Sequence, residues 1–339
     1  MDLLPSEEQV LLRDMVRRFL ADRQDANTMG RGPIAREDWL ALGELGLFAF
    51  LLPENAGGMG GGVADALIVA EEFGRGLAIT PLAESVLLCA ELIAQHGTPD
   101  QIERWVKQVV QGEAILAFAQ GVSAWRNGDA WILDGAAGLV RDGAGAAAIL
   151  VTTDNSQLLL VDAKAAGVVR TPVRLADGSA AADLRFDGAP STLISASPEH
   201  VSAAIGRAEL AIVSELVGLM ATLYEMTVNY VKQRRQFGVA IGSFQVVQHR
   251  CARLFMLLEQ SRSMLLKAAF VEEYARERAI VAARAYVSDA SLKLAEEVVQ
   301  LHGGMGVTDE LPVGRGLRRI LVLSKLFGGA ASARAALAA

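Results

Sequence analysis

Two stretches in the last third of the chain determine its fold, and the first is YVKQRRQFGVAIGSFQVVQH at residues 230–249. From Leu210 to Val231, apolar residues recur at three- and four-residue spacing, which indicates a long helix with one buried face. Three cations near its end are favourably placed against the helix dipole. A Phe-Gly turn follows, and Ser243 is expected to cap a second helix. The stretch therefore predicts two long helices joined by a tight turn.

The second stretch, QLHGGMGVTDELP at residues 300–312, predicts a third helix that ends in a glycine turn. Such a turn leaves backbone amides bare, and glycines without side chains let a ligand approach them. Arginine, as at Arg234 in the first stretch, offers a fork of donors to phosphate. Taken alone, each stretch is typical of an ordinary helix junction, because glycine is the usual residue just beyond a helix end.

Outward from these stretches the chain divides into three expected domains, which gives a fold that is mainly α with a small β domain. Residues 1–112 predict helices with short breaks, beginning with a helix capped by Ser6. Residues 113–197 alternate β-prone segments with Asp, Asn and Gly turns, which predicts a small antiparallel sheet. Residues 198–339 return to long helices and predict a four-helix bundle. The expected strands are 114–119, 130–133, 147–152, 157–161 and 181–186.

The composition excludes several classes of protein. Of 339 residues, 52% are hydrophobic and 21% are charged, which is typical of a packed globular chain. The net charge of −7 provides no overall positive field to attract nucleic acid or anionic lipid. No apolar run approaches the ~18 uninterrupted residues of a membrane span, and the charged N-terminus lacks the apolar core of a signal peptide. We therefore expect a cytoplasmic protein without a nucleic-acid or membrane partner.

Three patterns could indicate ligand sites, but the residues around each of them do not match the site that the pattern would require. Residues 143–148 satisfy G-x-G-x-x-A, but the residues that follow predict a strand rather than the helix of a dinucleotide site. The glycine-rich stretch 53–62 lacks the Gly-Lys-Ser/Thr of a phosphate loop, so we interpret it as close-packed backbone. Cys89 and Cys251 are isolated in apolar helical patterns, and they predict neither a disulfide framework nor a metal site.

Together the motifs resemble the acyl-CoA dehydrogenase family. Its RxxFG turn, FQ pair and QxxGGxG run recur here in the same order at residues 234–238, 244–245 and 300–306. The amino-terminal part also matches, with LGELGLFAFLLPENAGGMG at 42–60 and EEFGRGLAITPL at 71–82. The resemblance covers nearly the whole chain. It implies an N-terminal helical domain, a middle β domain and a C-terminal four-helix bundle.

In that family FAD lies across a subunit boundary. Its flavin ring rests against the subunit's own β domain, and its pyrophosphate and adenine reach into the C-terminal domain of a neighbouring subunit. The implied cofactor-binding residues are Arg234 for the pyrophosphate, Phe244 and Gln245 for the cofactor wall, and Gln300, Gly303 and Gly304 for the turn that holds the adenine half. All six match the family motifs.

Other positions depart from the family pattern. The chain has Phe118–Val122 in place of TEPxxGSD and Leu139–Gly143 in place of WITNG, so the Trp and Thr groups beside the flavin ring are absent. The usual catalytic base lies in YEGT, where this chain has Phe327–Ala330 without a carboxylate. A second family position falls on Ala208. Glu209 beside it would be turned by about 100° on the helix; otherwise we expect it at the surface or the substrate mouth. The catalytic residues stay unassigned.

Several single residues receive a structural interpretation. Glu215 is interpreted as structural, and His249 as a residue of helix packing or of a subunit contact. His302 precedes the glycine turn and is placed to touch FAD. The remaining histidines, His96 and His200, are expected to be exposed at helix ends.

The family reaction moves the α-proton of an acyl-CoA thioester to a carboxylate while the β-hydrogen leaves as hydride to the flavin. A positioned base contributes about a hundredfold to ten-thousandfold, and the flavin carries the redox step. A chain that keeps the nucleotide-tail site but has no base can still complete the FAD sites of a longer catalytic partner. We therefore hypothesise a short subunit of a hetero-oligomer, resembling those that act on CoA-linked steroid side chains. The alternatives are a self-sufficient homotetramer that uses Glu209 or an unrecognised base, and a binding module for acyl-CoA or protein that lacks FAD.

Overall fold

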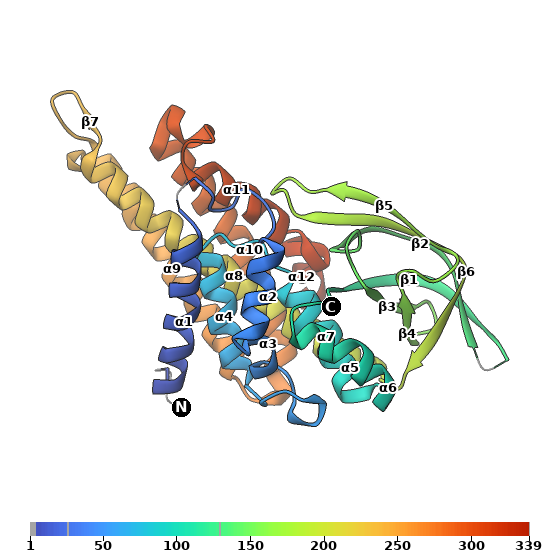
Figure 1. The fold of residues 1–339 in the computed structure, drawn as a ribbon. Coiled ribbons are helices and arrows are strands. Elements are labelled where there is room, and N and C mark those ends of the chain that lie inside the picture. The colour runs from blue at the N-terminus through green and yellow to red at the C-terminus, as the bar shows by residue number, and fades with distance from the viewer. Residues whose placement is uncertain (1–4, 26, 129, 339) are drawn as a thin grey trace. The chain divides into compact units, whose positions relative to one another are not determined.

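The computed structural model describes residues 5–25, 27–128 and 130–338, which form two compact units (Figure 1). The bundle unit comprises the described residues of segments 1–32, 63–79 and 209–339. The sheet unit comprises those of segments 33–62 and 80–208. Helices from the first 112 residues therefore contribute to both units. The fold is mainly helical with a β-sheet between the N- and C-terminal helices in sequence, as predicted.

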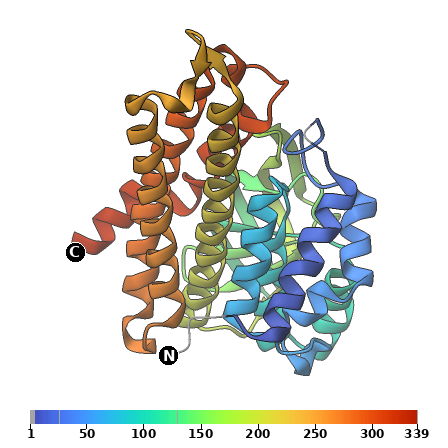
Figure 2. The same ribbon diagram turned by 90° about the vertical axis from the view of Figure 1, so that its left-hand side faces the viewer.

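The bundle unit is built on long helices, and Figure 2 shows three of them, α8, α9 and α10, running side by side. The first part of α8, to Ala208, belongs to the sheet unit. Ser6 caps the first helix as predicted, because its side chain accepts the amide of Gln9. The helices are α1 (Glu7–Arg23), α4 (Val63–Arg75), α8 (Pro198–Gln233), α9 (Gln245–Phe270), α10 (Glu273–His302), α11 (Pro312–Leu323) and α12 (Gly329–Ala338).

Helices α4 and α8 pack with their backbones almost in contact. A Cβ added to Gly74 would lie 2.1 Å from the carbonyl oxygen of Glu215, and one added to Gly218 would lie 2.0 Å from that of Glu71. Protein interiors have no slack to absorb such an overlap. Glycine at these two facing positions therefore sets the separation of the two helices.

The sheet unit holds six strands in the order β2-β1-β3-β4-β6-β5, and β2 also pairs with β6. The pairing of β2 with β6 closes five strands into a ring and leaves β5 at an edge. Buried side chains such as Val122, Leu133, Ile149 and Phe186 fill its core. The strands are β1 (Leu116–Asn127), β2 (Ala130–Arg141), β3 (Ala148–Thr153), β4 (Leu158–Asp162), β5 (Val168–Arg174) and β6 (Ala180–Ile194).

Short helices complete the sheet unit. They are α2 (Arg36–Glu44), α3 (Leu47–Phe50), α5 (Glu91–His96), α6 (Pro99–Gln101) and α7 (Lys107–Val110), with a 3-10 turn η1 (Glu54–Ala56) and two π-helical segments, η2 (Leu82–Ala90) and η3 (Ile102–Val106). The interpretation of residues 53–62 as close-packed backbone is confirmed. A Cβ on Gly58 would lie 2.1 Å from the carbonyl oxygen of Leu52.

The sheet differs from the prediction in three respects. It is mixed, because β1 and β3 run parallel while the other pairs are antiparallel. Strand β5 was not predicted, since its Pro172 argues against a central strand; an edge strand tolerates proline. Strand β2 continues to Arg141, although the glycines along it indicate a turn. The strand can continue because its pairing with β6 includes two register shifts.

The helix boundaries near the two decisive stretches also differ. Ser243 does not cap α9, since its hydroxyl donates to the carbonyl of Ala240 at 2.7 Å. The N-cap residue of α9 is Phe244, and the helix begins at Gln245. A 3-10 turn, η4 (Ile241–Ser243), displaces the hydroxyl from the capping position. Helix α9 ends at Phe270 and α10 begins at Glu273, whereas the sequence pattern predicts helices over residues 244–276 and 280–302.

Among the described residues, α8 is long and apolar enough to cross a membrane by length and composition alone. However, 78% of its most apolar window is buried, as in the core helix of a soluble protein. Helix α11 and the segment Leu326–Ala338 pass the same test only as a pair bent by 76°. These features are weak evidence for a membrane.

Candidate functional site

The predicted turn after α8 is a two-residue β-hairpin. Strand β7 (Arg235–Gln236) pairs antiparallel with β8 (Val239–Ala240), and the residues between them, Phe237 and Gly238, have φ of +54° and +81°. Positive φ at both positions is typical of the turn that joins tightly paired strands. The Phe237 side chain is 90% exposed although its backbone is in a region that bulky residues avoid. An exposed aromatic ring on a strained turn marks a contact surface.

The second stretch also folds as predicted, into a helix end followed by glycines. Helix α10 ends at His302, and Gly303, with φ of +59°, donates its amide to the carbonyl of Gln300. A 3-10 turn, η5 (Gly303–Val307), follows. A Cβ placed on Gly303 or Gly304 would meet nothing within 4 Å. The space above this backbone is therefore open to a ligand.

A buried histidine holds the two stretches together. The ring of His302 stacks on that of Tyr230 with centroids 4.3 Å apart, and the Tyr230 hydroxyl donates to the carbonyl of His302 at 3.3 Å. Nδ1 of His302 lies 2.8 Å from the carbonyl of Val298. Burial lowers the pKa of His302, so the neutral ring is favoured. A further ion pair, Arg250 with Glu297, joins the start of α9 to the last turns of α10.

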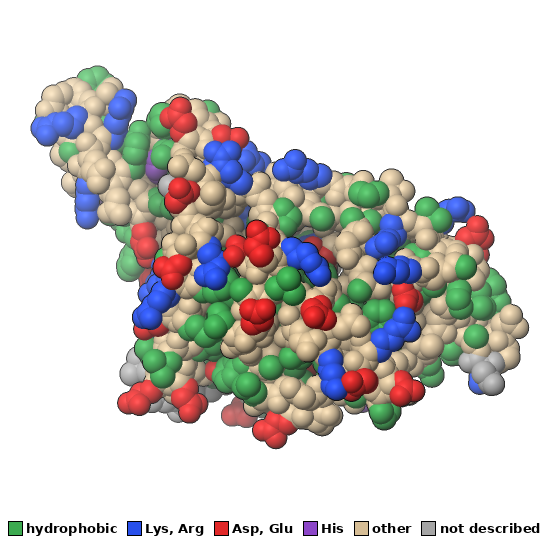
Figure 3. All heavy atoms as spheres, in the orientation of Figure 1, with side chains coloured by type: hydrophobic (Ala, Val, Ile, Leu, Met, Phe, Trp, Pro, Cys, Tyr) green, Lys and Arg blue, Asp and Glu red, His purple; other side chains and the backbone are tan. Residues whose placement is uncertain are grey.

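The structure thus brings the six predicted cofactor residues to one end of the bundle unit. Five of the six are exposed and Phe244 is half-buried. Figure 3 shows Lys and Arg side chains gathered at the projecting hairpin. The backbone of Arg234 is fixed, because its amide donates to Tyr230 and its carbonyl accepts from Ile241, each at 2.8 Å. Its guanidinium is free to reach an anion.

The segment Leu139–Gly143 of the sheet unit has a different character. Leu139 and Asp142 have φ of +52° and +56°, and Arg141 between them points inward, almost wholly buried. Arg141 Nη1 lies 3.4 Å from Oε1 of Glu84, which is equally buried on the π-helix η2. Sequence reasoning identified the absence of the Trp and Thr groups here but missed this ion pair. The hydropathy pattern carries no signal for it.

The carboxylates near the second family position are engaged in buried ion pairs with arginines. Glu209 is buried and forms an ion pair with Arg284 of α10. The expectation of a surface or substrate-mouth carboxylate is wrong, because Arg284 supplies the counter-charge that makes burial tolerable. Burial lowers the pKa of Arg284, because the charged guanidinium loses its hydration. Glu215 is likewise buried against Arg319 at 2.7 Å, in agreement with its structural interpretation.

Two sequence models match the chain: the N-terminal domain of acyl-CoA dehydrogenases over residues 6–113 and the C-terminal domain over residues 200–339. The chain belongs to the acyl-CoA dehydrogenase family. Among its relatives is the acyl-CoA dehydrogenase IpdE2 of Mycobacterium tuberculosis, which is 30% identical over 91% of this chain and 89% of its own length.

Solved structures of this family superpose on the whole chain. The ChsE4-ChsE5 complex of Mycobacterium tuberculosis is 27% identical with a TM-score of 0.93, covering 100% of this chain and 98% of that one. A variant of the Tcur3481-Tcur3483 steroid ACAD is 29% identical with a TM-score of 0.90, covering 98% and 97%. This chain therefore has the acyl-CoA dehydrogenase fold along its full length.

Acyl-CoA dehydrogenases use FAD. Of the two units of this chain, the bundle unit matches the chemistry of this cofactor better than the sheet unit does. The bundle end suits an anionic nucleotide tail, since it offers an exposed arginine and an open glycine backbone. The segment Leu139–Gly143 lacks the Trp and Thr of the family pattern, and its Arg141 is buried in an ion pair with Glu84.

The remaining candidate residues are histidines and cysteines outside the two stretches at the bundle end, or on their exposed surface. His249 is exposed, so it does not pack between helices of this chain, and the subunit-contact interpretation stays a prediction. His96 and His200 stack on each other with centroids 4.2 Å apart, and burial lowers the pKa of His96. Cys89 is buried and Cys251 half-buried, and both are free thiols. Within the described residues, no group of three or more His, Cys, Asp or Glu could hold a metal.

Proposed function

We propose that this chain is the short subunit of a heteromeric acyl-CoA dehydrogenase. Its bundle end binds the pyrophosphate and adenine of an FAD whose flavin ring and catalytic base are provided by a longer partner subunit. The observation that carries this proposal is a contrast. The residues assigned to the nucleotide tail are mostly exposed, whereas Arg141 and Glu209, at or beside the positions assigned to the ring and the base, are held in buried ion pairs. The proposal rests on the family resemblance for the placement of FAD.

The exposure of the tail surface supports a partner. Arg234, Gln245, Gln300 and the two glycines are uncovered in the single chain, and the Phe237 ring projects beside them. A site that one chain completes alone keeps its anchors at least partly enclosed, because pockets bury most of their ligand. A second subunit that covers this end would enclose the FAD tail and the Phe237 ring together.

The interior positions support the absence of a base in this chain. Where the family carries a base in YEGT, Phe327 has φ of +49° and precedes a buried glycine that begins α12. The Glu209 carboxylate, one residue from the second position, is held by Arg284. When bound, FAD supplies the hydride acceptor. The residues of this chain bind its phosphates and orient its adenine, and proton abstraction is left to the partner.

For the substrate we propose a CoA thioester with a steroid side chain. The similarity to a complex described as a steroid ACAD supports this class, as does the similarity to a second two-component complex, ChsE4-ChsE5.

Co-expression tests the proposal. The chain is produced alone and together with longer acyl-CoA dehydrogenase chains of the same genome, and flavin is measured from the visible spectrum of the purified material. We expect little flavin in the chain alone and about one FAD per pair with the correct partner. A chain that purifies alone with FAD and oxidises an acyl-CoA would overturn the proposal in favour of a homomer.

Arginine variants then locate the tail site in the co-purified complex. Arg234→Ala should weaken FAD retention by about tenfold or more, since it removes charge-assisted hydrogen bonds to phosphate. The matched control is Arg235→Ala, an equally exposed arginine one position along the hairpin. Equal flavin content in Arg234→Ala and Arg235→Ala complexes would refute the assignment of the pyrophosphate site.

A further inference from the structure

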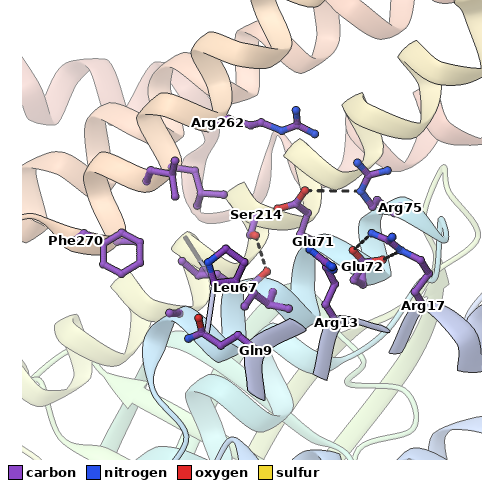
Figure 4. Close-up of a pocket in the computed structure, with 16 residues that line it drawn as sticks. Gln9, Arg13, Arg17, Leu67, Glu71, Glu72, Arg75, Ser214, Arg262 and Phe270 are labelled. Atoms are coloured by element: carbon purple, nitrogen blue, oxygen red, sulfur yellow. Dashed lines mark hydrogen bonds and ion pairs between the residues drawn. The ribbon is translucent and has the colours of Figure 1, made fainter. Parts of the chain in front are cut away.

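A cavity of about 350 Å³ lies within the bundle unit among α1, α4, α8 and α9, and the FAD-tail surface uses none of its residues (Figure 4). In its lining, the Ser214 hydroxyl of α8 donates to the backbone carbonyl of Leu67 of α4 at 2.7 Å. The cavity size is within the range of small-molecule sites.

The cavity is apolar on one side and charged on the other. Figure 4 shows Phe270 on one side, and Glu71, Glu72, Arg17 and Arg75 gathered on the other. The apolar lining comprises Leu67 and Ile68 of α4 and Leu265, Leu266, Ala269 and Phe270 of α9. The charged lining comprises Arg13, Arg17, Glu71, Glu72, Arg75 and Arg262. A ligand with a polar head and an apolar body matches this division.

The charged end favours an anionic head. Glu72 is only 3% exposed and accepts two hydrogen bonds from Arg17, at 2.7 and 2.9 Å, so its charge is already balanced. Glu71 lies 3.8 Å from Arg75, and burial raises the pKa of Glu71 above its usual value. Each of the two acids thus has an arginine partner, and the lining holds four arginines against two glutamates, so it offers no excess negative charge to a cation.

Two arginines of the lining remain available to a ligand. Arg13 contacts Asp14, the next residue of its own helix, at 3.3 Å. Arg262 contacts Glu259, one turn earlier on α9, at 2.6 Å. These contacts are partly exposed and local, and such pairs contribute little stability, so they exchange readily for a better-placed carboxylate.

We infer that this cavity binds a medium-chain carboxylate, with its head at the arginine end and its alkyl chain against α9. A cavity of about 150 Å³ accommodates benzene, so one of 350 Å³ accommodates about 14 non-hydrogen atoms by proportion. Decanoate, with about 12, fits within this limit, whereas a four-ring steroid acid has about twice that number and does not. The inference is independent of the proposed FAD role.

Calorimetric titration of the full chain, with its partner subunit where one co-purifies, tests this inference. The probes are decanoate below its micelle concentration, 1-decanol, and the decyltrimethylammonium cation. We expect saturable binding of decanoate, and binding at least tenfold weaker for the alcohol and the cation, which lack the charge-assisted hydrogen bonds. Equal binding of decanoate and 1-decanol would overturn the anionic assignment.

Paired variants on α9 locate the site. Ala269→Trp fills the cavity and should abolish decanoate binding, while Ala252→Trp, at an exposed position of the same helix, should leave it unchanged. Arg262→Gln should weaken binding about tenfold, with Arg253→Gln as the exposed control. Circular dichroism and flavin content check that each variant folds and assembles. Unaltered decanoate binding in folded Ala269→Trp would place the ligand elsewhere, such as the acyl-CoA site, and would refute the inference.

Discussion

Replacing Glu209 by glutamine separates the two roles that this carboxylate could have. Glu209 and Arg284 form a buried ion pair, and each side chain is 10% exposed. Glu209→Gln keeps the size of the side chain and removes its charge. A structural carboxylate predicts lower stability with unchanged turnover per bound FAD, whereas a catalytic base predicts lost turnover.

The expected loss of stability follows from the fate of Arg284. Removing one partner of a buried pair costs about 3–5 kcal/mol, because the other charge stays buried without compensation. We expect the lower end, about 3 kcal/mol, since water reaches a tenth of each side chain. That corresponds to about a 150-fold change in the unfolding equilibrium. Glu209→Leu combined with Arg284→Met removes both charges and should recover most of the loss.

Denaturant unfolding and steady-state kinetics of the assembled enzyme measure the two quantities. The unfolding midpoint should fall in Glu209→Gln with an unchanged denaturant slope. The control is Glu225→Gln, which breaks the exposed contact of Glu225 with Arg75 and should cost no more than about 0.5 kcal/mol. A loss of turnover of a hundredfold or more at an unchanged midpoint would identify Glu209 as the base and refute the structural role.

Three further predictions concern packing, thiol reactivity and pH. Gly218→Ala should destabilise the chain by about 1–3 kcal/mol in denaturant unfolding, because its Cβ overlaps the backbone of α4, while Gly145→Ala, which meets nothing, should cost little. Iodoacetamide should label Cys251 and spare Cys89 in the native chain by mass spectrometry, since Cys89 is fully buried and burial raises its pKa strongly. Stability should decline as the pH falls below about 6.5, because burial lowers the pKa of His302 and the unfolded chain then binds more protons; His302→Gln should flatten that part of the pH profile.

The fold and the two turns at the bundle end could be predicted because their signals are local in sequence. The helix end, the Phe-Gly turn and the glycine run each lie within about one helical turn of their motif, and local backbone preferences determine them. The Ser243 cap was wrong for a related reason. The residue type permits a cap, but an intervening 3-10 turn, which no composition signal marks, decides where the hydroxyl points.

The pairing of buried charges could not be predicted from the sequence. Glu209 meets Arg284 and Glu84 meets Arg141 across 75 and 57 positions of the chain, and only the fold brings them together. A carboxylate on an apolar helix has the same pattern whether it is buried with a partner or exposed at a site. The π-helix that carries Glu84 could not be predicted from the sequence either, because its apolar residues fit the pattern of an ordinary α-helix.

The positions of these pairs bear on the proposed function, in which this subunit keeps one half of a cofactor site and leaves the other half to its partner. The side chains of the tail surface are mostly exposed, so they contribute little to the stability of the fold and can serve binding instead. Arg141 and Glu209, at or beside the positions that the resemblance assigns to the ring and the base, are buried, and a buried charged group requires a partner. Arg141 with Glu84, and Glu209 with Arg284, satisfy that requirement within this chain. Placing a carboxylate at the fully buried Ala208 would add a charge without a counter-ion, so a single substitution there should destabilise the chain rather than restore a base.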